Sequence, residues 1–197
     1  MFHTRFVHLG ELRQWGVLPI VALILAISAC SSPQPAAAPP TGPIAGDWVG
    51  KVEGTDAFIG IASNGKEVMA YVCDGKAITQ WFHGTAGVDK VDLVAGTFNL
   101  SAGPAILQGQ LARDAATGAV TLANGQSFKY QASRAAGDAG LYRLEETVNN
   151  QKRLGGWVIL NDGQLRGITA NLNTGALQTQ ISLSNVAIKI GPSLDQY

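Results

Sequence analysis

Four Asn-Gly or Asp-Gly pairs most constrain what this chain can fold into. They are Asn64-Gly65, Asp74-Gly75, Asn124-Gly125 and Asp162-Gly163. Such a pair is the strongest short-range signal of a β-hairpin, because both of its residues tolerate the positive φ that a two-residue turn needs. Thr117-Gly118 and Thr174-Gly175 are weaker signals of the same kind, and Asn149-Asn150 suits a further hairpin. The spacing of these turns predicts many short antiparallel strands.

The runs between the turns alternate with a period of two, as β-strands do. In one of them, Val68, Ala70 and Val72 fall on one face, and Met69, Tyr71 and Cys73 fall on the other. No convincing amphipathic helix is present. Strands are predicted over residues 47–52, 57–63, 66–73, 76–83, 90–99, 105–112, 119–122, 127–133, 140–147, 152–160, 165–171, 177–184 and 186–190.

Short strands at a spacing of about 8–12 residues are typical of a β-sandwich or barrel. Hairpins throughout favour an up-and-down meander, because antiparallel neighbours can be joined by two residues. Closure into a barrel also removes exposed strand edges. We expect residues 44–197 to form an all-β domain, a single antiparallel up-and-down meander closing as a β-barrel, or a related β-sandwich.

The N-terminal residues have the order of an export signal. Arg5 and Arg13 precede an apolar run from Val17 to Ile27, which is too short to span a bilayer and fits a signal-peptide core of roughly 7–15 residues. The run ends in Ile27-Ser28-Ala29-Cys30, which resembles the lipobox of bacterial lipoproteins. The resemblance covers about the first 30 residues. It implies that residues 1–29 are a lipoprotein signal peptide, that cleavage makes Cys30 the first mature residue, and that Cys30 carries the lipid.

A tether follows, over residues 30–43, and holds five of the eight prolines with no charge and no aromatic residue. Such a stretch cannot bury enough apolar area to offset its conformational entropy, and a Pro-rich spacer stays extended. Without the two arginines and one glutamate of the signal peptide, twelve basic and thirteen acidic residues remain. A nucleic-acid partner, which requires a basic face, is therefore not expected.

Residues that could carry chemistry are sparse. Cys73 and His83 are the only cysteine and histidine of residues 44–197. With a tight turn at Asp74-Gly75, Cys73 would face Lys76 and His83 would face about Lys66. That is too far for a nucleophile–base hydrogen bond of about 2.6–3.2 Å. Zinc requires several Cys and His ligands, and Glu145-Glu146 would point to opposite faces of a strand. We expect no catalytic residue, no metal and no cofactor.

Large residues on the predicted strands are the candidates for ligand binding: Trp48, Tyr71, Trp81, His83, Tyr142 and Trp157. Gly46-Asp47-Trp48 resembles the Gly-x-Trp that opens lipocalin- and avidin-type barrels, although no second lipocalin motif is present. Tyr71-Val72-Cys73-Asp74-Gly75 is similar to a strand and turn of membrane-bound lysozyme inhibitors, which are small β-barrel lipoproteins. That family uses its cysteine in a disulfide, whereas this domain has no second cysteine.

We expect a membrane-anchored lipoprotein of the bacterial cell envelope, facing outside the cytoplasm. Its non-enzymatic β-domain would bind a small apolar molecule or an envelope protein. An inhibitor or structural interaction module without a ligand cavity is the alternative, and an enzyme ranks third. A ligand carrier would hold an aromatic-lined cavity. An interaction module would have a filled barrel and an exposed apolar patch.

Replacement of Cys30 by Ser tests the lipid anchor. The mature wild-type protein should begin at Cys30 and carry added acyl mass, because two or more acyl chains are needed for a stable anchor. The variant should gain no lipid, and Cys73→Ser should leave the lipid in place. Intact-mass spectrometry distinguishes these results, and a wild-type chain without added mass would refute the anchor.

Overall fold

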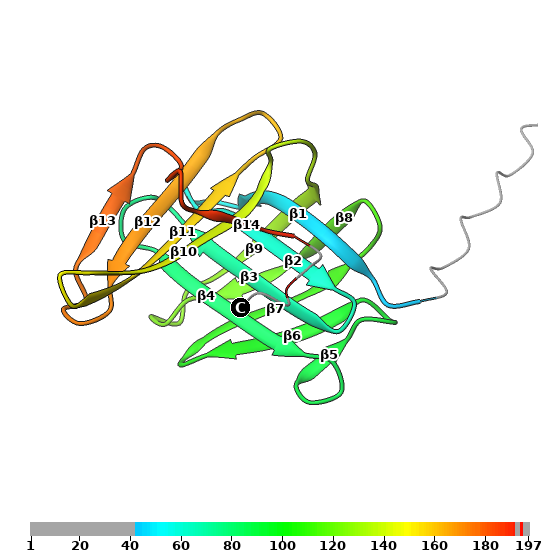
Figure 1. Ribbon diagram of the computed structural model, residues 1–197. Helices are drawn as coiled ribbons and strands as arrows, with labels where there is room; N and C mark the ends of the chain where they lie inside the picture. Colours follow the sequence, from blue (N-terminus) through cyan, green and yellow to red (C-terminus); the bar gives the residue numbers. More distant parts are fainter. Residues whose placement is uncertain (1–41, 192–193, 195–197) are drawn as a thin grey trace, which may run out of the picture. The chain divides into compact units, whose positions relative to one another are not determined.

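The computed structural model describes residues 42–191 and residue 194 (Figure 1). The predicted signal peptide, Cys30 and the tether up to residue 41 lie outside the described residues. Within residues 42–191 and 194 the structure is strands and turns, and no helix there is long and apolar enough to cross a membrane. The all-β class is confirmed. The strands are β1 (Ala45–Val52), β2 (Phe58–Asn64), β3 (Glu67–Cys73), β4 (Thr79–Thr85), β5 (Lys90–Asp92), β6 (Thr97–Ala102), β7 (Ala105–Leu111), β8 (Ala115–Thr121), β9 (Ser127–Arg134), β10 (Gly140–Val148), β11 (Gln151–Ile159), β12 (Leu165–Asn171), β13 (Leu177–Gln180) and β14 (Ile188–Ile190).

The first nine strands form one antiparallel meander that is nearly closed as a barrel, in the order β4-β3-β2-β1-β9-β8-β7-β6-β5. The pairing of β1 with β9 brings the two ends of this segment together. At the opposite side β4 lies next to β5 and β6 without a shared ladder. The predicted barrel meander is therefore confirmed, with a seam between β4 and β5.

A second sheet, in the order β13-β12-β11-β10-β14, is the part of the fold that the sequence did not predict. It covers the outer face of β1, β2 and β3 (Figure 1). Leu141 of β10 lies against Gly60 of β2, whereas Arg143, two residues later, lies over Trp81 of β4. The strands of the second sheet therefore run across those of the barrel.

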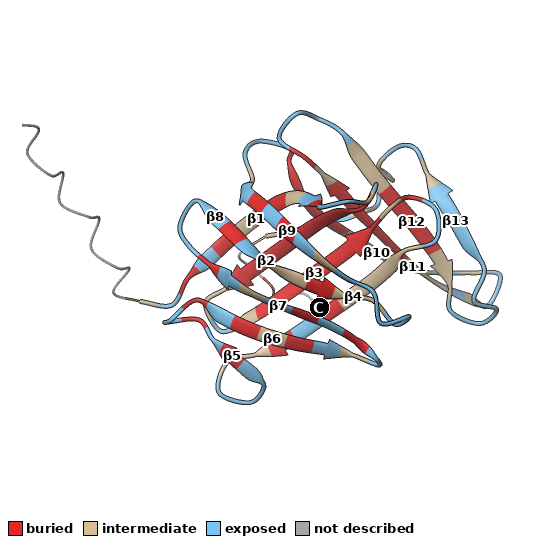
Figure 2. Cartoon of the chain, turned by 180° about the vertical axis from the view of Figure 1, so that it is seen from behind, coloured by how far each residue is buried: buried red, intermediate tan, exposed pale blue. Residues whose placement is uncertain are grey.

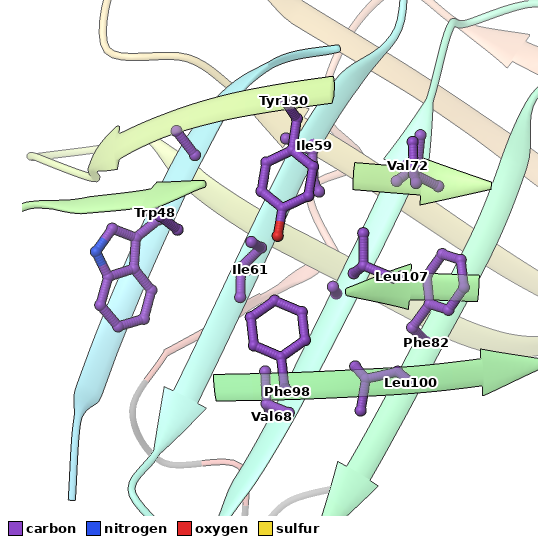
Figure 3. Packing of buried hydrophobic residues seen from close by; sticks show 14 of the residues in the cluster. Trp48, Ile59, Ile61, Val68, Val72, Phe82, Phe98, Leu100, Leu107 and Tyr130 are labelled. Atoms are coloured by element: carbon purple, nitrogen blue, oxygen red, sulfur yellow. The ribbon is translucent and has the colours of Figure 1, made fainter. Parts of the chain in front are cut away.

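Two separate cores result from this arrangement. The interior of the barrel is filled by apolar side chains, among them Trp48, Phe98 and Tyr130 (Figure 3). The second core lies between the barrel and the second sheet and includes Tyr71 and Val158. Strands β2 and β3 contribute to both cores and are buried almost throughout, as Figure 2 shows. Their predicted alternation is confirmed, because the residues of the two faces of β3 belong to different cores.

The turns lie where the Asn-Gly and Asp-Gly pairs predict them, but their geometry differs. In each pair only the glycine has a positive φ. The Asn or Asp instead accepts hydrogen bonds from backbone N–H groups further along the turn, as Asp74 does from Lys76, Ala77 and Ile78. Such side-chain bonds favour wider loops than a two-residue turn. The two-residue turn with positive φ at both positions is Asn149-Asn150, as predicted.

Two local predictions are wrong. The strand predicted over residues 90–99 is two strands, β5 and β6, because the Asp92 carboxylate accepts from the N–H groups of Val94 and Ala95 and reverses the chain there. Thr117-Gly118 is not a turn but part of β8. A side chain at Gly118 would collide with the backbone of Gly109 on β7. The glycine therefore allows β7 and β8 to lie close together.

Gly156 of β11 permits the second sheet to approach the barrel. A Cβ atom there would lie 2.5 Å from Cζ of Tyr71 and 2.8 Å from Cζ2 of Trp81. Tyr71 cannot move away cheaply, because it is fully buried and its hydroxyl is hydrogen-bonded to Thr79 Oγ1 at 2.9 Å. The contact between the two sheets therefore requires glycine at this position.

Replacement of Gly156 by Ala should lower the free energy of unfolding by about 1–3 kcal/mol, the usual cost of overpacking a well-packed core. Gly42→Ala is the matched control, since a Cβ atom there would meet nothing within 4 Å. Its effect should stay within about 0.5 kcal/mol. Urea unfolding followed by tryptophan fluorescence measures both, and equal midpoints for the two variants would contradict the proposed packing.

Candidate functional site

The outer faces of β3 and β4 bring together three of the predicted ligand-binding residues, Tyr71, Trp81 and His83. Register places Met69 opposite His83 and Tyr71 opposite Trp81. The Tyr71 and Trp81 rings are stacked, with centroids 4.4 Å apart. The guanidinium carbon of Arg143, from β10, lies 4.7 Å from the centroid of Trp81. A cation at this distance over an indole face is attracted by the ring quadrupole, so Arg143 joins the second sheet to the edge of the barrel.

A hollow of about 540 Å³ opens next to this stack, and we name it the β4 groove. It is lined by Met69, His83, Arg143, Leu144, Glu145, Val186 and Ile188. His83 Nε2 lies 3.6 Å from Glu67 Oε2 at one margin, and the His83 side chain is half exposed. Val186 and Ile188 are 57% and 52% exposed. The groove therefore combines a histidine, an arginine and apolar side chains that are open to solvent.

A second hollow, of about 410 Å³, adjoins the β4 groove and shares Arg143 and Glu145 with it. Arg143 forms an ion pair with Glu145, and Arg153 lies 4.0 Å from Glu146. Leu172, which is exposed, also lines this hollow. Paired charges beside exposed apolar groups resemble the polar rim and apolar centre of a protein interface.

The structure brings together only some of the predicted ligand-binding residues. Tyr71, Trp81 and His83 are neighbours on the barrel's outer face, as described above. Trp48 is buried inside the barrel, where its indole N–H donates to the carbonyl of Ala112 at 3.1 Å. It packs the core and lines none of the hollows described here.

Tyr142 and Trp157 lie directly opposite each other on β10 and β11, on the face of the second sheet that points away from the barrel. Trp157 Nε1 donates to the carbonyl of Ser182 at 3.0 Å. The Tyr142 hydroxyl donates to the carbonyl of Asp138 at 2.7 Å. Because Ser182 accepts the bond from Trp157, the segment 181–187, which connects the edge strands β13 and β14, lies against this ring. Both rings serve packing, and neither lines the β4 groove.

Cys73 and His83 are not paired across the strands, as predicted. The predicted register of β3 against β4 is nevertheless wrong. Cys73 lies opposite Thr79 and not Lys76, and His83 lies opposite Met69 and not Lys66, because Asp74 holds a wider loop. Burial raises the pKa of the Cys73 thiol, and its sulfur accepts from the N–H of Gly75 at 3.2 Å. A buried thiol held in its neutral form is a poor nucleophile. Among the described residues no cluster of His, Cys, Asp or Glu could hold a metal.

Arg143, Val186 and Ile188 complete the groove and were not predicted as site residues. They lie far from Met69 and His83 in the sequence and form no motif with them. One signal was available, because Met69, Tyr71 and Cys73 are apolar on the face of β3 opposite to Val68 and Val72. A strand that is apolar on both faces must be covered on both, so a second layer over β3 could have been expected.

No protein-family model matches this chain, and no curated protein or solved structure matches it. The proposed function therefore rests on the geometry of the barrel and the groove.

Asp47 of β1 lies in the same outer-face row as His83, through the pairs Asp47–Ala62, Ala62–Met69 and Met69–His83. Its Oδ1 is buried without a hydrogen-bond partner among the described residues. Burial raises the pKa of the Asp47 carboxyl above its usual 3.8, although Lys189 and Arg134 partly oppose the rise. The charged form of Asp47 is thus disfavoured in the folded protein.

This shift predicts a pH dependence of stability. The unfolded chain ionises Asp47 first, so the folded protein binds more protons at this site and loses stability as the pH rises through the raised pKa. Asp47→Asn should remove that loss. Relative to the wild type, the free energy of unfolding of the variant should increase as the pH rises from about 4 to neutrality. Below the ordinary pKa of an aspartate the difference between the two proteins should stay constant. Urea titrations across this range measure the difference, and a difference independent of pH would contradict the prediction.

Proposed function

We propose that this chain is a lipid-anchored protein of the bacterial cell envelope whose β-domain binds another envelope protein through the β4 groove, without catalysing a reaction. The observation that carries the proposal is the contrast between a filled barrel and an apolar outer surface. Apolar side chains occupy the barrel interior. Emptying such a core for a ligand would cost about 2–5 kcal/mol for each large side chain removed.

The exposed apolar residues support a protein partner. Five of the large ones follow one another in the C-terminal part of the described chain: Leu172, Leu177, Ile181, Val186 and Ile188. Leu177 and Ile181 lie at the β13 edge of the second sheet, away from the other three. Val186 and Ile188 line the β4 groove, and Leu172 lines the hollow beside it. Exposed apolar groups that gather on one side and are rimmed by charges mark interaction sites, whereas singly scattered ones carry no such meaning.

The paired charges support specificity of binding. Arg143 stacks on Trp81 and is also paired with Glu145, so its guanidinium is already oriented before a partner arrives. Tryptophan and arginine are the residues that most often dominate the energy of protein interfaces. The half-exposed His83 beside Glu67 adds a group that can donate or accept a hydrogen bond.

A small apolar molecule in the same groove is the second candidate. The volume of about 540 Å³ falls within the range of roughly 300–1,000 Å³ that is usual for small-molecule sites. Met69, Val186 and Ile188 would supply the apolar contacts.

A photo-crosslinking amino acid at position 188 tests the protein partner in intact cells. Ile106 is the matched control, because it is also an exposed isoleucine but lies on β7 of the barrel, outside the β4 groove. We expect one dominant protein adduct at position 188, its loss on Val186→Asp, and no such adduct at position 106. The purified partner should reproduce the adduct.

Equal adducts at both positions, or none at position 188, would refute the protein partner. Native mass spectrometry of the gently purified chain then decides the second candidate. A non-covalent small molecule retained by the wild type and lost on Val186→Asp would place that molecule in the groove, and its absence would refute this candidate as well.

A further inference from the structure

Strand β13 is an open edge of the second sheet. Its one neighbour in the sheet is β12, and within the described part of the chain no element lies beyond it (Figures 1 and 2). Leu177 is 43% exposed, and Ile181, which follows the strand, is 93% exposed. An open edge with apolar side chains is a template for pairing with a further strand.

The backbone of β13 has free groups on that edge. Asn171 N–H donates to the carbonyl of Ala176 at 2.8 Å, so Ala176 directs its backbone toward β12. Along an antiparallel strand the direction alternates from residue to residue. Gln178 and Gln180 therefore also face β12, whereas the N–H and C=O groups of Leu177 and Thr179 face the open edge. Ile181 follows the last residue of the strand and would join the pairing by continuing it.

Nothing in the sequence blocks this edge. Natural edge strands are usually protected by a charge, a proline or a bulge. Between Arg166 and Lys189 the chain has neither a charged residue nor a proline. The other edges are protected, since β14 carries Lys189 and the barrel edges β4 and β5 lie against each other.

We propose that β13 pairs in antiparallel fashion with β13 of a second copy of this chain, about a two-fold axis through Thr179. Residues 177–181 read Leu-Gln-Thr-Gln-Ile, which is nearly the same in both directions. The axis would place Leu177 opposite Ile181, Gln178 opposite Gln180, and Thr179 opposite its own copy. The apolar pair is favourable across strands, and the two amides can bond each other. The Thr179 hydroxyl takes no part in the pairing, because it donates to the carbonyl of Gly75 within its own chain at 2.7 Å.

This pairing is self-complementary in the way that a two-fold interface requires. It satisfies the outward backbone groups and covers Leu177 with Ile181 on both sides of the axis. It brings no like charges together, because the segment is uncharged. Two short strands bury less than the roughly 1,600 Å² of a standard interface, so the dimer should be weak and visible only at high protein concentration. The inference is independent of the β4 groove, whose lining includes no residue of β13.

Thr179→Cys in the full chain, purified in detergent, tests the register directly. Opposed residues of such a pair have Cα atoms about 5.5 Å apart, within the range that a disulfide can bridge. Mild oxidation should give a covalent dimer. Gln178→Cys and Gln180→Cys are the matched controls, because in this register neither residue lies opposite its own copy. Both should crosslink far less. The wild type should not crosslink, because Cys73 is buried and the thiol of Cys30, its other cysteine, would carry the proposed lipid.

Charge variants test the same register without altering Thr179. Leu177→Lys with Ile181→Lys, and Leu177→Glu with Ile181→Glu, should each be monomeric because like charges would face each other. An equimolar mixture should form a heterodimer, as sedimentation in a density-matched detergent would measure. A wild type that stays monomeric, controls that crosslink as well as Thr179→Cys, or a mixture that does not associate would each overturn the proposal. Hydrogen exchange of the backbone amides of Leu177 and Thr179 gives a further outcome. If these amides exchange slowly only after another envelope protein is added, the edge pairs with a strand of that protein and the proposal is overturned.

Discussion

The burial of β2 and β3 on both faces is the constraint on which the rest of the structure depends. One face of each strand closes the barrel interior, with Ile59 and Val72, and the other meets the second sheet, with Phe58 and Tyr71. Each fully buried large apolar side chain contributes roughly 1.5–3 kcal/mol. Without the second sheet the outer face of β3 would expose several such residues to water, so the barrel by itself would not be a self-sufficient unit.

The same constraint explains the glycines at the contact between the sheets. Gly60 lies beneath Leu141 and Val158, and Gly156 lies above Tyr71 and Trp81. Small residues here allow two curved layers to meet closely, and close packing leaves little free volume between them. Hollows beside this contact therefore lie at its margins, whereas a further hollow of about 660 Å³, lined mainly by residues of β6 to β9, lies away from it on the barrel. The β4 groove forms at such a margin, where β14 and the middle of β10 lie beside β3 and β4.

Much of the fold can be predicted from the sequence because hairpins depend on short stretches of chain. The Asn-Gly and Asp-Gly pairs and the alternation of residues 68–73 give the strands and their faces. The second sheet cannot be predicted in this way, since the sequence around Leu141 does not indicate that Gly60 will lie beneath it. The groove is missed for the same reason. His83 is a predicted site residue, but Arg143 and Ile188 come from distant segments, and Trp48 is attractive as an aromatic although it only fills the core.

The second sheet separates two kinds of surface. The β4 groove lies at the edge formed by β14, whereas β13 is the opposite edge of the same sheet. Pairing through β13 would therefore leave the groove open on each copy and present two grooves in one assembly. Two linked sites bind a multivalent partner far more tightly than either site alone, because the second contact becomes intramolecular. Binding at the groove and pairing at the edge would thus reinforce each other on a membrane surface, where the proposed lipid anchor would hold many copies close to one another.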